Sequence, residues 1–264
     1  MRIDRTQVEC LIKNAAGQEL LSRFNKVDHS YKLDGSVITE ADLAMQARLA
    51  KELVSLYPNT VLLGEEMPVE QQQNLLDTGE AVWCLDPLDG TSNYSAGIPY
   101  FSVSLALLSQ GKVIFGLVYD PVRDEMFVAD EDGVSFLNGI PLQLKESGRA
   151  LKKSTAMIDF KRLPESLAVS LVASPPYASQ RSYGSVALDW CWLAAGRGHV
   201  YLHGRSQIWD YAAGHYIFTC AGGLSCSFDG GDVFQQQLVP RSAIAAVDKS
   251  LFDNWFSWIS QNNI

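Results

Sequence analysis

The sequence predicts a mixed α+β and α/β protein in which helices and sheets are packed in layers. Amphipathic helical patterns occupy much of residues 8–57, a meander of short apolar strands begins at residue 101, and strands alternate with helices after residue 138. Sheets and amphipathic helices each have an apolar face to bury, so we expect helices to cover the faces of the sheets. With 264 residues, 47% of them hydrophobic, the chain is long enough for one large domain or two smaller ones.

Two helices are predicted at the start of the chain. Apolar residues at helical spacing indicate a first helix that reaches about Phe24. The second pattern begins after Thr39, a good N-cap that is followed three residues later by the acidic Asp42, and it continues to Tyr57. Pro58 then ends the helix, because proline disrupts helical hydrogen bonding.

Short strands dominate the next part of the sequence. Residues 60–64 are predicted to form a strand that ends just before Glu65 and Glu66. The apolar run 81–85 is predicted to form another strand, which an Asp-Pro pair breaks. The meander then comprises residues 101–108, 112–119, 125–129 and 134–137.

The second half of the chain alternates between strands and helices. Strands are predicted at residues 155–158, 199–202, 224–228 and 243–247, and helices at residues 165–172, 185–195, 209–220 and 251–259. We therefore place a boundary near residue 148. It separates an N-terminal α+β part, residues 1–148, from a C-terminal α/β part, residues 149–264.

Charge and cysteine content argue against several classes of protein. The formal net charge of −9 disfavours a nucleic-acid-binding surface, which requires clustered Lys and Arg. It would also repel an anionic substrate, unless some of the acids bind divalent cations that reverse the local field. Five scattered cysteines without a Cys-x-x-Cys pair indicate neither a disulfide framework nor a zinc site. No apolar run approaches the ~18 residues of a membrane span, so we expect a cytoplasmic protein.

The most informative segment places Asp86 and Asp89 three residues apart at the end of an apolar strand. Asp-Pro and Asp-Gly pairs are common turn signals, but their combination at this spacing keeps both carboxylates near one point while the chain turns. Two hard oxygen ligands so close together suit Mg²⁺. The backbone N–H groups of Gly90 and Thr91, at a turn or helix start, are suited to bind a phosphate oxygen. This loop is therefore predicted to bind a cation and a phosphate group together.

Further carboxylates for a metal site follow a predicted strand and begin a predicted helix. Glu65 and Glu66 follow the strand at residues 60–64, and Asp210 stands at the start of the helix at 209–220. Hydrolysis of a phosphate monoester is very slow without a catalyst, and two metal ions about 4 Å apart are a common means of accelerating it. Such a site needs several carboxylates, so these acids are candidate metal ligands.

Four motifs in this order resemble those of the inositol monophosphatase family, the lithium-sensitive, Mg²⁺-dependent sugar and inositol phosphatases. They are Lys32-x-Asp34-x-Ser36-x-x-Thr39-x-x-Asp42, Gly64-Glu65-Glu66, Asp86-Pro87-Leu88-Asp89-Gly90-Thr91 and Trp209-Asp210-x-Ala212-Ala213-Gly214. The resemblance implies a layered αβαβα sandwich of the inositol monophosphatase and fructose-1,6-bisphosphatase type. It also implies a metal-dependent phosphoric monoester hydrolase that forms a homodimer and uses two or three Mg²⁺ ions per active site.

The resemblance implies a set of metal ligands. Glu65, Asp86 and the carbonyl of Leu88 would hold a first Mg²⁺. Asp86, Asp89 and Asp210 would hold a second, so that Asp86 would bridge the two ions. An alternative from the sequence alone is that Asp210 is no more than an acid favoured at a helix N-terminus.

The resemblance also implies catalytic roles around the phosphate loop. Thr91, hydrogen-bonded to Asp42, and Glu65 would orient and deprotonate the attacking water, while the amides of Gly90 and Thr91 would bind the phosphoryl oxygens. A Thr hydroxyl alone is a poor base and requires an acidic partner. Two alternatives stay open, namely that Asp42 only completes a capping box and that Glu66 is a solvated neighbour rather than a ligand.

Substrate contacts are expected in the second half of the chain. Inositol phosphatases carry a Glu six residues before the Trp-Asp pair, at the position where this chain has His203. This departure argues against a preference for inositol. The segment at residues 181–185 resembles the one that lines the substrate hydroxyls in the family, so Gly184 and Ser185 are expected to bind substrate. Our hypothesis for His203 is that it also binds substrate, by hydrogen-bonding a polar leaving group. For Lys161 and Arg162 the alternatives are contact with a second anionic group and simple solvation in a loop.

We therefore expect a Mg²⁺-dependent phosphomonoesterase that acts on a small polyol, sugar or amino-alcohol phosphate through a metal-activated water. Inositol 1-phosphate and histidinol phosphate are candidate substrates, and no direct binding of nucleic acid or membrane is expected. A rival hypothesis is a regulatory protein that keeps the family fold and acts through a protein or RNA-processing partner with little or no turnover. The complete carboxylate set argues against the loss of catalysis.

Overall fold

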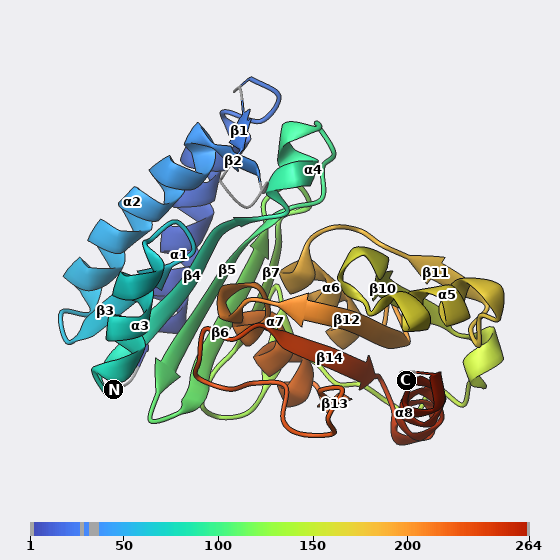
Figure 1. Cartoon of the computed structure of the whole chain (residues 1–264). Coiled ribbons are helices and arrows are strands. Elements are labelled where there is room, and N and C mark those ends of the chain that lie inside the picture. The colour runs from blue at the N-terminus through green and yellow to red at the C-terminus, as the bar shows by residue number, and fades with distance from the viewer. Residues whose placement is uncertain (1–2, 27–28, 32–36, 263–264) are drawn as a thin grey trace.

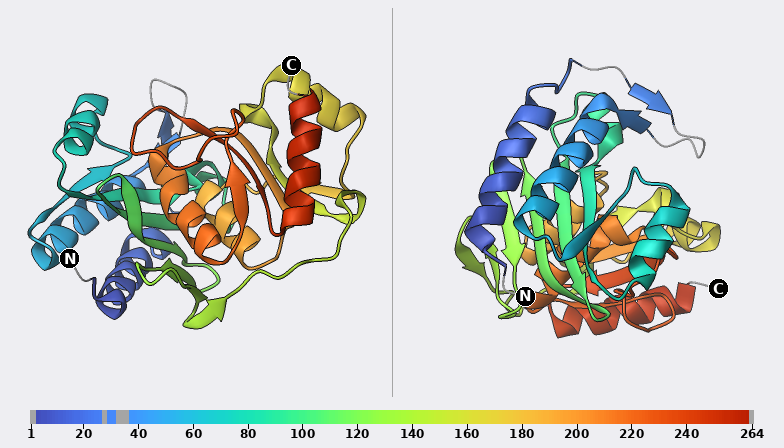
Figure 2. Two further views of the ribbon diagram at one scale, coloured as in Figure 1. Left: turned by 90° about the horizontal axis from the view of Figure 1, so that it is seen from below. Right: turned by 90° about the vertical axis from the view of Figure 1, so that its left-hand side faces the viewer.

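The computed structural model describes residues 3–26, 29–31 and 37–262. These residues form five stacked layers in the order helices, sheet, helices, sheet, helices (Figure 1 and Figure 2). The first and last helices, α1 and α8, lie in the two outer layers. This arrangement confirms the predicted αβαβα sandwich.

The first two layers come from the N-terminal part of the chain. α1 (Arg5–Ala16) and α2 (Glu40–Leu56) cover one face of a seven-stranded sheet. From edge to edge, the sheet contains β3 (Thr60–Gly64), β4 (Ala81–Asp89), β5 (Ser102–Ser109), β6 (Lys112–Asp120), β7 (Glu125–Ala129), β8 (Ser135–Leu137) and β9 (Ile140–Leu142). β3 and β4 are parallel, and all other neighbouring pairs in this sheet are antiparallel.

Four shorter elements complete this part of the fold. β1 (His29–Tyr31) and β2 (Val37–Thr39) form an antiparallel pair just before α2. α3 (Val69–Asp77) connects β3 to β4, and α4 (Thr91–Ser95) follows β4 directly. α3 therefore leads into the amino end of β4, whereas α4 begins at its carboxyl end.

The remaining three layers come from the C-terminal part. α6 (Val186–Ala194) and α7 (Ile208–Cys220) lie between the two sheets. The second sheet contains, in order, β11 (Ser179–Arg181), β10 (Thr155–Asp159), β12 (Val200–Ser206), β14 (Arg241–Ala246) and β13 (Leu224–Cys226). β11, β10 and β12 are parallel, whereas β14 is antiparallel to both neighbours. α5 (Glu165–Ala173) and α8 (Lys249–Asn262) pack together as the outer layer, and 3₁₀ turns at Leu151–Lys153 and Phe160–Arg162 flank β10.

β4 lies in the interior of the molecule with both of its faces covered. Trp83 and Leu85 face the core under α1 and α2, whereas Val82 and Cys84 face the central helices. A strand that is buried on both faces has no polar side, which explains why its sequence is a continuous apolar run.

β4 continues to Asp89, beyond the end predicted at residue 85. Asp86 pairs with Ser104 and Asp89 pairs with Ser102, so two residues of β4 oppose one residue of β5 between these pairs. This β-bulge accommodates Pro87, which has no N–H to donate to the ladder. In a regular strand Asp86 and Asp89 would point to opposite faces, whereas the bulge places them on the same face as the Ser102–Ser104 side of β5.

Other differences from the predicted elements are confined to short segments. The first α-helix ends at Ala16 and continues as a π-helical turn, Gly17–Leu21, so regular helix stops before the predicted end at Phe24. The sequence analysis did not predict α3, β9 or β11, whose few apolar residues give a weak periodic signal. Lys32, Asp34 and Ser36 of the first family motif lie outside the described residues.

The two predicted parts of the chain share one extensive contact. The sheets fall on either side of residue 148 in sequence, yet α7 packs against β4, β5 and β6 of the first sheet. The division at residue 148 therefore stays a prediction. Among the helices of the described segments, none is both long and apolar enough to cross a membrane.

Candidate active site

The parallel pairing of β3 and β4 brings Glu65 beside Asp86 at one end of the first sheet. Gly64 pairs with Leu85, and the N–H of Glu65 donates to the Leu85 carbonyl at 3.1 Å. Because the carboxyl ends of parallel strands meet at the same edge of a sheet, Glu65 and Asp86 leave their strands together. Two of the predicted metal ligands are therefore neighbours.

Asp210 reaches the same place from the C-terminal part of the chain. Ser104, the β5 partner of Asp86, donates its hydroxyl to the carbonyl of Trp209 at 2.9 Å. This bond fixes the start of α7 over the face of the sheet that carries Asp86. Asp210 Oδ2 also accepts the Gln207 N–H at 2.9 Å, so Asp210 caps its helix as well as joining the carboxylate cluster.

Burial and mutual repulsion perturb these carboxylates. Asp86 and Asp89 are only 2% and 7% exposed. Burial raises the pKa of Asp86 well above its ordinary value, and the charges of Glu65, Asp89 and Asp210 raise it further. Burial also raises the pKa of Asp210, to which Asp89 and Glu65 add, and it raises the pKa of Asp89 to about 6. A bound cation would relieve this repulsion and favour the ionised carboxylates.

Hydrogen bonds orient the two carboxylates of β4. Asp86 Oδ1 accepts the Leu88 N–H at 3.0 Å, while Asp89 Oδ2 accepts the Ser185 hydroxyl at 2.6 Å and the Ala187 N–H at 2.7 Å. In the described segments, no three His, Cys, Asp or Glu side chains are close enough to enclose a metal ion as they stand. The support for a Mg²⁺ site is therefore the presence of several hard oxygen donors buried close together, not a complete set of coordinating atoms around one point.

Thr91 and Asp42 form the predicted pair. The Thr91 hydroxyl lies 3.0 Å from Asp42 Oδ1 and 2.8 Å from the Leu88 carbonyl, and it can donate to either. Asp42 Oδ2 accepts both the N–H and the hydroxyl of Thr39, at 2.8 and 2.6 Å. Asp42 therefore completes the capping box of α2 and also binds Thr91. Burial raises the pKa of Asp42, although the hydrogen bonds from Thr39 and Thr91 oppose this rise.

Gly90 shapes the loop between β4 and α4. Its φ of 96° lies in the left-handed region that favours glycine. A Cβ atom at this position would lie 3.0 Å from the Tyr100 carbonyl oxygen and 3.3 Å from the Gly184 carbonyl oxygen. The predicted phosphate loop is therefore packed directly against the segment that contains Gly184.

Ser185 and Gly184 lie next to the carboxylate cluster, as part of the turn that precedes α6. Ser185 is the N-cap of α6, is only 1% exposed, and donates its hydroxyl to Asp89. Gly184 has a φ of 86° and sits against the side chain of Asn93. The structure thus gives the Ser185 hydroxyl a role in orienting Asp89, which the sequence analysis did not foresee. Contacts of either residue with substrate stay predictions.

His203 is buried, with 3% of its surface exposed, and both of its ring nitrogens have partners inside the protein. Nδ1 accepts the Arg205 N–H at 3.2 Å, and Nε2 lies 3.2 Å from Asp159 Oδ2. The ring must therefore carry its hydrogen on Nε2 and donate it to Asp159. The predicted contact between His203 and a leaving group would require one of these two bonds to be exchanged, and it stays a prediction.

Asp159 is a candidate that the sequence analysis missed. It ends β10, pairs in register with His203 on β12, and has a side chain that is 31% exposed. Its Oδ1 accepts the N–H of Lys161 at 3.0 Å. Burial tends to raise the pKa of Asp159, but the hydrogen bonds that it accepts from His203 and Lys161 help to lower the pKa below its ordinary value. Its place after a predicted strand was the only available signal.

Lys161 and Arg162 occupy the 3₁₀ turn that follows Asp159, and both are exposed. Burial dominates the raised pKa of Asp210, and the positive charge of Arg162 acts in the opposite direction. Arg162 is therefore within electrostatic range of the carboxylate cluster. Its contact with a second anionic group stays a prediction.

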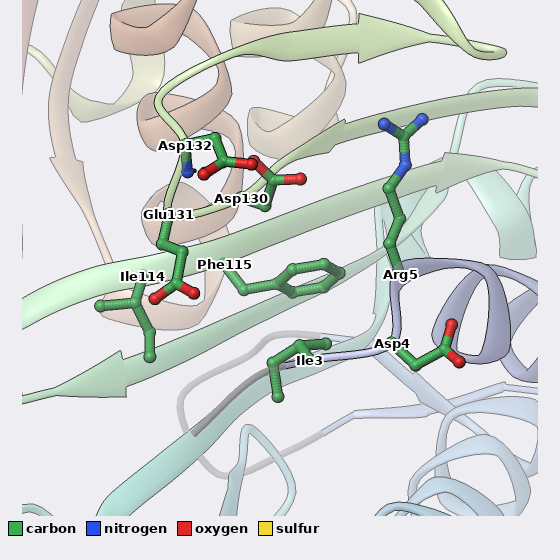
Figure 3. A pocket seen from close by; sticks show the side chains of 8 residues that line it. All are labelled: Ile3, Asp4, Arg5, Ile114, Phe115, Asp130, Glu131 and Asp132. Atoms are coloured by element: carbon green, nitrogen blue, oxygen red, sulfur yellow. Dashed lines mark hydrogen bonds between the residues drawn. The ribbon is translucent and has the colours of Figure 1, made fainter.

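A separate pocket lies at the other end of the first sheet. It has a volume of about 500 Å³ and is lined by the start of α1, the start of β6 and residues 130–132 (Figure 3). Phe115 in its wall pairs with Leu107 of β5, at the end of that strand away from Ser102 and Asp89. Arg5 in the same wall lies over the Phe136 ring at 4.2 Å. This pocket is not part of the carboxylate site.

Comparisons with known proteins identify the family. The sequence profile of the inositol monophosphatase family matches residues 3–257. The Haemophilus influenzae protein named Nus factor SuhB is 32% identical over 80% of this chain and 79% of its own length. Inositol monophosphatase 1 of Bos taurus is 29% identical over 81% of this chain and 78% of its own length. The solved structure of the Thermotoga maritima IMPase has a TM-score of 0.83 and 25% identity, with coverage of 98% of this chain and 97% of that one. The chain therefore belongs to the inositol monophosphatase family.

Proposed function

We propose that this chain is a Mg²⁺-dependent phosphomonoesterase that hydrolyses a small polyol, sugar or amino-alcohol phosphate. The observation that carries the proposal is the convergence of Asp86, Asp89 and Asp210 on one buried site beside the Gly90 loop. Membership of the inositol monophosphatase family supports it. Inositol 1-phosphate and histidinol phosphate are the substrates to test first.

The proposed metal ligands are the carboxylates that perturb one another. Glu65, Asp86 and the Leu88 carbonyl would hold one Mg²⁺, and Asp86, Asp89 and Asp210 would hold another. When bound, the ions would lower the pKa of a water molecule and neutralise charge on the phosphate group. The sheet bulge supports this assignment, because it places both Asp86 and Asp89 on one face.

The proposed catalytic residues orient water and phosphate. In this role the Thr91 hydroxyl would donate its hydrogen to Asp42, which lies 3.0 Å away, and the lone pairs of its oxygen would accept a hydrogen from the attacking water. Glu65 would accept the proton of that water. It lies close enough to this pair for its charge to raise the pKa of Asp42. The amides of Gly90 and Thr91 would bind the phosphoryl oxygens.

For the leaving group, we propose contacts with the turn at Gly184 and Ser185 and with the Asp159–His203 pair. Asp159 is the more exposed member of that pair, and His203 orients its carboxylate through the contact between Nε2 and Oδ2. A carboxylate that accepts hydrogen bonds suits the hydroxyl groups of a polyol or sugar. His203 then acts on the leaving group through Asp159, unless binding exchanges one of its own hydrogen bonds.

Phosphate release with and without Mg²⁺ tests the proposal. Wild-type protein is expected to release phosphate only with Mg²⁺ and to be inhibited by Li⁺, whereas Asp89→Asn is expected to lose activity because its neutral amide is a poor cation ligand. Asp253→Asn, a change at an exposed residue of α8 that pairs with Lys249, serves as the matched control. Equal release by wild type and Asp89→Asn would end the proposal.

We further propose a cytoplasmic homodimer, as is usual for this family. Light scattering of the purified protein would give twice the mass of the 264-residue chain. A mass equal to that of one chain would contradict the homodimer.

The second candidate function is regulation through a protein or RNA-processing partner. The observation that favours it is the similarity to the Haemophilus influenzae protein named Nus factor SuhB. The net charge of −9 disfavours direct RNA binding, so a protein partner is the form to test. In a deletion strain, Asp89→Asn would restore the wild-type phenotype if regulation is the main role, and would fail to do so if catalysis is.

A further inference from the structure

Asn93, in the short helix after the phosphate loop, bonds two segments that are distant in sequence. Its Nδ2 donates to the Tyr100 carbonyl at 2.8 Å and to the Tyr183 carbonyl at 2.7 Å. A side-chain amide has two N–H hydrogens, so both are used. Tyr100 precedes β5 of the first sheet, whereas Tyr183 belongs to the turn before α6. One side chain thus joins the two parts of the fold.

The turn that Asn93 holds is the one that orients Asp89. Gly184 follows Tyr183 in the left-handed conformation, and a Cβ atom there would lie 3.1 Å from the Asn93 amide nitrogen. Ser185 follows next and donates its hydroxyl to Asp89 at 2.6 Å. Ala187 donates its N–H to the same oxygen at 2.7 Å. Asp89 therefore accepts hydrogen bonds from a helix start whose preceding turn is tied to Asn93.

The phosphate loop at Gly90 also packs directly against both segments that Asn93 joins. The added Cβ at Gly90 would meet carbonyl oxygens of both Tyr100 and Gly184, at 3.0 and 3.3 Å. The segments that contain Tyr100 and Gly184 are therefore both in close contact with the phosphate loop. A shift of the turn at Gly184 would move both the wall of that loop and the donors to Asp89.

We propose that Asn93 is a positioning residue that couples the phosphate loop to the turn at Tyr183, and thereby sets the orientation of Asp89 and the affinity for divalent cation. This inference rests on the proposed function, because it assigns Asp89 to the metal site. Asn is the required residue because Ser has one donor, and Asp would place a carboxylate against two carbonyl oxygens. Side chains that orient metal ligands typically change metal affinity by about 10–100-fold when they are removed.

Calorimetric titration of Mg²⁺ into purified variants tests the inference without relying on turnover. We expect Asn93→Ala to weaken Mg²⁺ binding about tenfold, the lower end of that range, with Asn93→Ser in between because it retains one donor. Asn254→Ala deletes an exposed amide that donates to Ser250 on α8, and as the matched control it should bind Mg²⁺ like wild type. Circular dichroism establishes that each variant is folded. If Asn93→Ala does not fold, the same comparison is made with Asn93→Ser.

A double-mutant cycle with Ser185→Ala identifies the route of the effect. If Asn93 acts through the turn that positions Ser185, the double variant should bind Mg²⁺ little more weakly than the weaker single variant, because interacting residues are not additive. If the loss of Mg²⁺ affinity in the double variant equalled the product of the two single losses, the proposed coupling between Asn93 and Ser185 would be overturned. Unchanged Mg²⁺ affinity in a folded Asn93→Ala or Asn93→Ser variant, with a lower unfolding temperature alone, would show a purely structural role and overturn the inference. Failure of the wild type to bind Mg²⁺ would instead refute the proposed function.

Discussion

Replacement of Thr91 by Val tests the proposed catalytic pair most simply. It exchanges one hydroxyl for a methyl group of similar size. The lost hydroxyl lies 3.0 Å from Asp42 Oδ1 and 2.8 Å from the Leu88 carbonyl. Asp42 is completely buried, and its other oxygen already accepts two hydrogen bonds from Thr39. The substitution therefore leaves Oδ1 of a buried carboxyl without a described donor.

The magnitude of this loss follows from the buried acceptor. An unsatisfied buried acceptor costs about 1–3 kcal/mol of folding free energy. For a chain of this size, that cost lowers the unfolding temperature by roughly 2–10 °C. Burial already raises the pKa of Asp42 against the hydrogen bonds of Thr39 and Thr91, so the loss of Thr91 raises this pKa further. Removal of a group that orients the attacking water is expected to lower kcat by about 10²–10⁴-fold.

Steady-state kinetics at saturating Mg²⁺ measure this effect. Thr91→Ser keeps the hydroxyl and removes only the methyl group, so it should retain most of the wild-type kcat. Thr91→Val should lose kcat with little change in KM, because the phosphate-binding amides remain. Wild-type kcat in a folded Thr91→Val protein would refute the role given to the Thr91–Asp42 pair. Equal losses in both variants would assign the effect to packing instead of the hydroxyl.

Three further predictions concern specificity, pH and backbone shape. Asp159→Ala should raise KM for polyol phosphates by about 10-fold, which is the scale of one lost hydrogen bond to a charged group. For a phosphate ester without leaving-group hydroxyls, kcat/KM should stay unchanged. An equal loss of kcat/KM for both esters would contradict the proposed contact. Burial lowers the pKa of His215 to about 4 from its ordinary 6.5, so the folded state binds fewer protons and stability falls as pH drops from 6.5 toward 4. Because His215 is only partly buried, this loss of stability is at most about 3 kcal/mol. Urea unfolding at pH 7 and 4.5 should show a smaller loss of stability in His215→Gln, and an equal loss in the two proteins would contradict the role given to His215. Gly90→Ala should lower stability by about 1–3 kcal/mol, since it forces a strained φ of 96°, and a wild-type unfolding temperature would contradict the assigned loop conformation.

The sequence predicted best those elements whose ends carry a capping residue, a proline or a glycine. Residues Thr39 and Pro58 bracket α2, and its capping box with Asp42 is present in the structure. β3 matches its predicted residues, 60–64, because this short apolar run is bounded by a turn at one end and by Gly64 and acidic residues at the other. Such signals depend only on neighbouring residues, so they can be read without knowledge of the fold.

The β4 bulge shows where local reading was incomplete. The Asp-Pro pair correctly marked an irregularity, but the strand resumes pairing with β5 and continues to Asp89. A break in one strand and a bulge in a pair of strands have the same local sequence. Only the partner strand, with Ser102 and Ser104 in register, distinguishes them.

Long-range contacts account for what the sequence did not reveal about the site. Ser185 was expected at the substrate, and its bond to Asp89 depends on the packing of α6 against the first sheet. Asn93 and Asp159 have no distinctive local pattern, because their partners lie in other segments of the chain. The candidate loop at residues 86–91 could be singled out from the sequence because its acidic, glycine and threonine residues are clustered within a few positions, whereas the residues that orient its side chains are not.

Diffraction from crystals soaked in Mn²⁺ tests the central claim most directly. Mn²⁺ prefers the same hard oxygen ligands as Mg²⁺ and gives an anomalous signal. The account predicts anomalous peaks between Asp86, Asp89 and Asp210, with Glu65 at their edge. An absence of peaks at this site, with Asp210 turned away from the two β4 carboxylates, would contradict it.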